Sequence, residues 1–199
     1  MRKSSLLAVL MLLLFAGASL ATPVNFDVAG ASGGSSVTLS NISTVPAGWT
    51  SLDASLASGL DSTVFSLNDG ESATFDFFTL TASGLGLGSA DISATLAFDA
   101  PPALSGSGIG GVSWGSFFGL ISAGVLNWDS TPSVATLADG NMVSMEFESG
   151  VAVECGNAAT VHATVTNLGG AAPVPEPSTF LLLGAGIAGL AFYRRKKSA

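Results

Sequence analysis

The middle of this 199-residue chain lacks lysine and arginine altogether. All fourteen acidic residues lie in the segment from Ser4 to Tyr193, so no positive and fourteen negative charges give it a net charge of −14 with His162 neutral, against −8 for the whole chain. Such a segment repels nucleic acid, anionic polysaccharide and anionic lipid, and it lacks the usual partners of phosphate and sulfate groups. The composition therefore excludes nucleic acid as an expected partner.

Histidine and cysteine each occur only once, which limits catalysis and metal binding. A site with several histidine ligands cannot form, and a Ser/His/Asp triad would have to be centred on His162. We therefore expect His162 to be a structural or exposed strand residue, and we predict no catalytic residue and no enzyme. Cys155 cannot form an intrachain disulfide, and we expect a small packing residue, with pairing to another chain or lipid attachment as alternatives.

The glycine-rich and acidic turns do not match known cofactor loops. Gly84-x-Gly-x-Gly88 and Gly106-x-Gly-x-Gly-Gly111 lack the Lys-Ser/Thr of a phosphate loop. The turns at Asn68–Glu71 and Asp139–Asn141 fall short of the D-x-D-x-D-G spacing of a calcium loop. We expect neither a metal site nor a cofactor, and Ca²⁺ is the one alternative left open.

The N-terminus has the three parts of a secretory signal peptide. Two cations at positions 2 and 3 precede an apolar run from Leu6 to Phe15, and Ser19-Leu20-Ala21 is a small-x-small cleavage site. We predict cleavage after Ala21, with cleavage after Ala18 as the alternative. Residues 1–21 are therefore the signal peptide, and the exported part begins at Thr22.

The C-terminus combines a short motif, an apolar segment and a basic end. The motif consists of Val174, Pro175, Glu176, Pro177 and Ser178, and the basic end consists of Arg194, Arg195, Lys196 and Lys197. As a helix, the apolar residues 180–193 would span about 21 Å, less than the roughly 30 Å of a hydrocarbon core. The cations should hold this end in the cytoplasm as a membrane stop. On physical grounds alone, a sorting signal and a single-pass anchor both fit.

This C-terminal pattern resembles the PEP-CTERM sorting signal of Gram-negative bacteria. The resemblance implies recognition by an exosortase, an integral-membrane cysteine transpeptidase-like enzyme. It also implies transient anchoring in the inner membrane, followed by release to the cell surface or the extracellular matrix. Proteins with this signal tend to belong to organisms that make extracellular polysaccharide.

The sequence between the two ends is typical of a β protein. Strong helix formers such as Lys, Arg, Gln and Glu are rare there, and short β-type runs recur between Gly, Asn, Asp and Pro residues. These runs are Ser36–Ile42, Ser62–Leu67, Ser72–Thr81, Asp91–Phe98, Val112–Ile121, Val134–Leu137, Met142–Phe147, Val151–Glu154 and Thr160–Thr166. We predict one all-β domain at residues 22–166, an antiparallel β-sandwich of the jelly-roll or Ig-like kind.

Two further features concern the connections between strands. Residues 66–77 and 136–147 share the pattern Leu, Asp-Gly and acid-Phe, and Asp-Gly predicts a tight hairpin turn in each. We expect residues 106–111 to form a surface loop. Residues 167–173 are predicted to be a flexible linker that leads into the sorting signal at 174–199.

Two functions remain possible for the exported domain. The first is a non-enzymatic surface or extracellular-matrix protein that associates with exopolysaccharide or biofilm. The alternative is a carbohydrate-binding or carbohydrate-active β-sandwich. Trp49, Trp114 and Trp128 could form a platform for sugar rings, although buried aromatics are the default expectation. Asn41-Ile-Ser43 fits the glycosylation sequon.

Overall fold

The computed structural model describes residues 23–117, 121–122, 124–154 and 156–170, together with seven positions between 184 and 194. The chain divides into two units, Met1–Gly169 and Gly170–Ala199. The predicted signal peptide, including its cleavage site at Ala21, lies outside the described residues, and so does the motif at 174–178.

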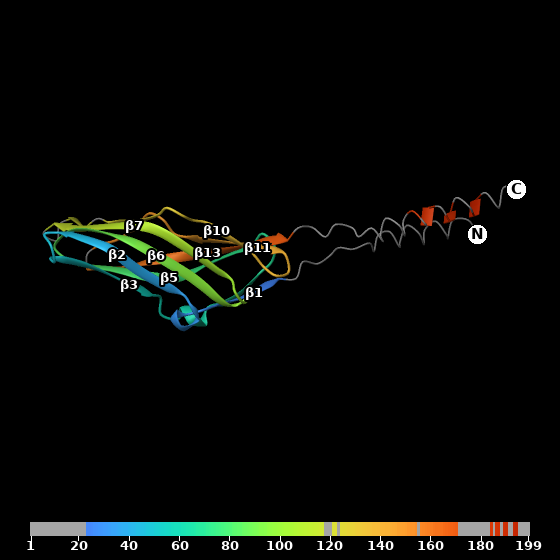
Figure 1. Cartoon of the computed structure of the whole chain (residues 1–199), viewed down its shortest axis with the longest axis horizontal. Helices are drawn as coiled ribbons and strands as arrows, with labels where there is room; N and C mark the ends of the chain where they lie inside the picture. The colour runs from blue at the N-terminus through green and yellow to red at the C-terminus, as the bar shows by residue number, and fades with distance from the viewer. Residues whose placement is uncertain are drawn as a thin grey trace. The chain divides into compact units, whose positions relative to one another are not determined.

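The first unit folds into two antiparallel sheets that pack face to face (Figure 1). In the described residues the larger sheet has the strand order β12-β9-β7-β6-β1-β4, with β2 paired to β6 and β8 paired to β7. Its strands are β1 (Val24–Val28), β2 (Ser36–Val45), β4 (Val64–Leu67), β6 (Gly86–Ala100), β7 (Ser105–Phe117), β8 (Ile121–Ser122), β9 (Val125–Trp128) and β12 (Val151–Ala152).

The smaller sheet has the order β10-β11-β13-β5-β3. Its strands are β3 (Thr50–Leu56), β5 (Ser72–Gly84), β10 (Ser133–Thr136), β11 (Asn141–Phe147) and β13 (Ala158–Gly170), and two short 3₁₀ helices, η1 (Ala31–Gly33) and η2 (Leu60–Ser62), lie in connections. This arrangement confirms the predicted all-β antiparallel sandwich.

The core lies between the two sheets and is built from alternate residues of each strand. In β13, Val161, Ala163 and Val165 are fully buried, and the polar residues between them face outward, as their alternation predicts. The largest side chain of the core is Trp114 on β7, whose Nε1 donates to Thr50 Oγ1 at 2.8 Å. This bond joins the two sheets and satisfies the polar atom of a buried indole.

Residues 106–111, predicted to form a loop, lie in the middle of β7, so that prediction was wrong. β7 pairs with β6 on one side and with β9 on the other. A Cβ atom on Gly106 would lie 2.8 Å from Met145 Sδ, and one on Gly108 would lie 2.8 Å from a carbon of the Phe147 ring. These glycines face the core, where the opposite sheet leaves no room for a side chain.

The two Asp-Gly turns differ. The turn at Gly140 joins β10 to β11 as predicted, and Leu137 N donates to Asn141 O at 2.7 Å across it. The turn at Gly70 is not a hairpin, because β4 pairs with β1 in the larger sheet whereas β5 belongs to the smaller one. Asp69-Gly70 therefore carries the chain from one sheet to the other.

The last strand is longer than predicted. β13 continues to Gly170, four residues into the expected linker. Asn167 is fully buried, and its Nδ2 donates to Leu67 O at 3.2 Å. A polar residue that looked suited to a linker thus holds the end of β13 against the connection that follows β4.

Candidate functional site

The C-terminal segment is described only in part. Within the predicted apolar segment, the described positions are α-helical and consist of Gly184, Gly186, Ile187, Gly189, Leu190 and Tyr193. Arg194 is also helical, whereas Arg195, Lys196 and Lys197 lie outside the described residues. Taking only the positions that are described, no helix reaches the length and apolar character needed to cross a membrane.

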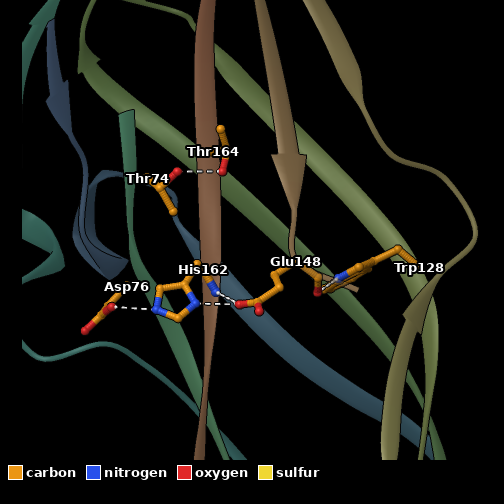
Figure 2. Close-up of polar contacts among 6 residues, drawn as sticks. All are labelled: Thr74, Asp76, Trp128, Glu148, His162 and Thr164. Carbon is orange, nitrogen blue, oxygen red and sulfur yellow. Dashed lines mark hydrogen bonds and ion pairs between the residues drawn. The ribbon is translucent and has the colours of Figure 1, made fainter. Parts of the chain in front are cut away.

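His162 lies on the outer face of the smaller sheet, between two carboxylates. Its Nε2 is 3.2 Å from Asp76 Oδ1 and its Nδ1 is 2.5 Å from Glu148 Oε2. Figure 2 shows the imidazole ring with one carboxylate on each side. All three side chains are partly exposed to solvent, at 40% for His162, 67% for Asp76 and 47% for Glu148.

The strand register brings these three residues together. His162 on β13 pairs with Asp76 on β5, next to an irregularity between Val161 and His162. Glu148 directly follows β11, and its backbone N donates to His162 O at 2.9 Å. Glu148 is held from the other side by Trp128, whose Nε1 donates to Glu148 O at 3.0 Å (Figure 2).

The geometry of this cluster suits a structural role. Both ring nitrogens of His162 face carboxylates, so each has a side-chain partner within the sheet. Within the described parts of the chain, no group of three histidine, cysteine, aspartate or glutamate side chains is placed to hold a metal ion.

The three tryptophans do not form a common platform. Trp114 is buried, and Trp128 packs against Phe78 and Phe147 with ring centroids 6.2 and 5.3 Å apart. Trp49 is 64% exposed in the connection between β2 and β3. Among the described rings, none of the contacts joins two tryptophans. The expectation that the tryptophans are buried is therefore confirmed for Trp114 and wrong for Trp49.

A shallow hollow of about 270 Å³ lies on the outer face of the larger sheet. The side chains and backbone that line it come from β2, β6, β7 and β9, and they include Asn41, Ser89, Asp91, Gly111, Ser113 and Asn127. Asn41 Nδ2 donates to Asp91 Oδ2 at 2.6 Å. Sequence analysis singled out Asn41 only as part of a glycosylation sequon and placed Gly111 in a loop. It missed Ser89, Asp91, Ser113 and Asn127, because four strands bring these residues together. Cys155 lies outside the described residues.

Comparison with known families identifies the C-terminal segment. Residues 173–197 match the model described as the PEP-CTERM protein-sorting motif. Neither a curated protein nor a solved structure matches the chain. The match confirms the resemblance seen in the sequence and indicates an exported protein that is sorted by an exosortase, a membrane enzyme. It lies wholly within the C-terminal segment and carries no argument about the sandwich.

Proposed function

We propose that the protein is a non-enzymatic component of the cell surface or extracellular matrix of a Gram-negative bacterium, where it associates with exopolysaccharide. The observation that carries this proposal is the PEP-CTERM match at residues 173–197. A signal peptide cleaved after Ala21 exports the chain. Exosortase then recognises residues 174–178 while the apolar segment stays briefly in the inner membrane.

The make-up of the apolar segment supports a brief stay in the membrane. Residues 180–193 are six or so short of the roughly 20 apolar residues that usually span a bilayer. Gly184, Gly186 and Gly189 weaken the helix and let it pack closely against a helix of another protein. The basic residues 194–197 keep the end on the cytoplasmic side, where it marks the limit of export.

The contacts of His162 support a role without catalysis. A general base needs a free lone pair within reach of the proton that it removes. The ring of His162 is instead bonded on both sides to the carboxylates of Asp76 and Glu148. A triad centred on the chain's one histidine would first have to break one of these contacts.

The charge of the sandwich limits the kind of polysaccharide that it can join. Glu176 lies in the sorting motif, so thirteen of the fourteen acidic residues fall in residues 23–170, which contain no Lys or Arg. A surface of this kind repels polymers rich in uronic acid or sulfate. Without a bridging cation, association with an exopolysaccharide must therefore rest on hydrogen bonds or apolar contacts. The alternative of a carbohydrate-binding sandwich is favoured by the hollow at Asn41 and Asp91.

Expression in an exosortase-containing host tests the sorting step. A variant with Pro175→Ala, Glu176→Ala and Pro177→Ala removes the motif. A matched control with Ala171→Ser and Ala172→Ser changes the adjoining segment alone. We expect the parent and the control in the matrix fraction and the motif variant in the membrane fraction. An equal share of all three proteins in the matrix would refute sorting through this motif.

A further inference from the structure

We propose that the hollow on the outer face of the larger sheet binds a neutral saccharide, with Gly111 as its floor and Asn41, Asp91 and Asn127 as its walls. This inference rests on the proposed function, for which it supplies a ligand class and a site. It concerns residues that neither the sorting motif nor the His162 cluster uses.

The strand register places the polar groups in one row across the sheet. Asp91 on β6 pairs with Gly111 on β7, and Gly111 pairs with Asn127 on β9. Since neighbouring strands lie about 4.8 Å apart, the backbones of Asp91 and Asn127 are roughly 10 Å apart. The next row holds Ser89, Ser113 and Val125. The hollow of about 270 Å³ that these rows line is slightly smaller than the roughly 300–1,000 Å³ of typical ligand sites, which suits a single sugar unit.

Gly111 keeps this hollow open. Positions 107, 109, 111 and 113 of β7 all face outward, and Gly111 is the one without a side chain. A Cβ atom on Gly111 would meet nothing within 4 Å, and the backbone there does not adopt a positive φ. Neither packing nor backbone conformation therefore requires glycine at this position, in contrast to Gly106 and Gly108. Because Gly111 has no side chain, space remains between Asp91 and Asn127.

A β-bulge brings Asn41 to the same place. Between Ser40 and Ser43, three steps along β2 are matched by two steps along β6, from Asp91 to Ser89. Asn41 in this bulge has φ 50°, and its side chain reaches Asp91 at 2.6 Å. The bond fixes both side chains and still leaves the carboxamide oxygen of Asn41 and Oδ1 of Asp91 as acceptors.

The chemistry of the lining groups selects the ligand class. Two carboxamides, one carboxylate and the hydroxyls of Ser89 and Ser113 offer both donors and acceptors, as a ligand rich in hydroxyl groups requires. Val125, which is 37% exposed, offers an apolar edge for the C–H face of a sugar ring. Anionic ligands would face Asp91 with no cation in the sandwich to balance them. These properties together fit a neutral saccharide.

A substitution at Gly111 tests the site without removing any interaction of the fold. Gly111→Val fills the hollow, and Ser107→Val serves as the matched control because it adds a similar side chain on the same face of the same strand. The full-length proteins, kept in a detergent without a sugar headgroup, are applied to immobilised neutral glucans and galactans and to alginate as the anionic comparison. Thermal unfolding of each variant reports whether it is folded.

We expect the parent protein and Ser107→Val to be retained on at least one neutral polysaccharide, and Gly111→Val to lose this retention with an unchanged unfolding midpoint. Equal retention of Gly111→Val would overturn the hollow as the site. Retention on alginate alone, or on no glycan, would overturn the ligand class. Applying the same variants to matrix isolated from a producing host separates the two proposals. If the matrix retains Gly111→Val as well as the parent, matrix association stands and the saccharide site fails.

Discussion

The polar groups on the outer faces of the two sheets differ in how far they are hydrogen-bonded to one another. On the smaller sheet, His162 is bonded to Asp76 and Glu148, and each partner meets the hydrogen-bonding needs of the ring. On the larger sheet, Asp91 and Asn127 stand on either side of a glycine with open space above it. Both nitrogens of the His162 ring are bonded from within the chain, whereas in the hollow only Asn41 and Asp91 are bonded to each other and the remaining polar atoms face solvent.

This difference separates residues that hold the fold from residues that can meet a ligand. A polar cluster whose members bond one another gains little from a further partner and loses contacts when one enters. A row of exposed acceptors and donors around an open floor can exchange its hydrogen bonds to water for hydrogen bonds to a ligand without breaking contacts of the fold. The more conspicuous group in the sequence, the single histidine, is therefore the poorer candidate for ligand binding.

The largest effect should come from replacing a glycine by valine on the inner side of β7, compared with the same replacement on its outer side. Gly108→Val places a side chain against Phe147 in the core, so we expect a loss of roughly 1–3 kcal/mol in the free energy of unfolding, or failure to fold. Gly111→Val should change it by less than about 0.5 kcal/mol. Urea unfolding midpoints of the two variants check the contrast. Similar losses in both would mean that the space above Gly111 is not open.

A smaller effect should come from salt. The sandwich has thirteen acidic residues and no Lys or Arg, so its surface charges mostly repel one another and screening should stabilise it. We expect the melting temperature to rise by about 2–5 °C between about 0.05 and 0.5 M NaCl. Sodium chloride is preferred to sulfate, which stabilises proteins in general. A falling melting temperature would show that attractive ion pairs dominate.

The smallest effect should come from the His162 cluster. A double-mutant cycle with His162→Gln and Glu148→Gln should give a coupling free energy of about 0.2–1 kcal/mol, because the pair is partly exposed. Glu146→Gln is the matched control, since Glu146 is an exposed acid near the end of β11, two residues before Glu148, and the ion pairs of His162 within the described residues go to Asp76 and Glu148. A coupling free energy no larger than that of the control would show that the cluster does not stabilise the fold.

The sequence predicted the fold where the signals are local. Alternation in Thr160–Thr166 and the turn at Asp139-Gly140 predicted the face of β13 and the β10–β11 hairpin correctly. Strand β3 was missed because Thr50–Leu56 is rich in small polar residues and has few β-branched ones. The glycines at 106 and 108 looked like part of a loop because the close approach of the opposite sheet is visible only in the packing.

The functional sites also differ in how far the sequence predicts them, because one is contiguous and the others are assembled by strand pairing. The sorting signal is read from contiguous residues, and its motif was identified from the sequence alone. Asp76, Glu148 and His162 come from three separate segments, and their meeting depends on register and on the irregularity beside His162. Asn41 and Asp91 meet through a bulge whose position no short sequence pattern specifies.

Both outer faces act outside the cell only if the sandwich is exported and released, which makes processing of the two ends the central claim. Intact-mass analysis of the mature protein from a native producing host tests it most directly. We predict a chain that begins at Thr22 and ends near Pro177, without residues 180–199. A mature mass that still includes Phe180 to Ala199 would contradict the account.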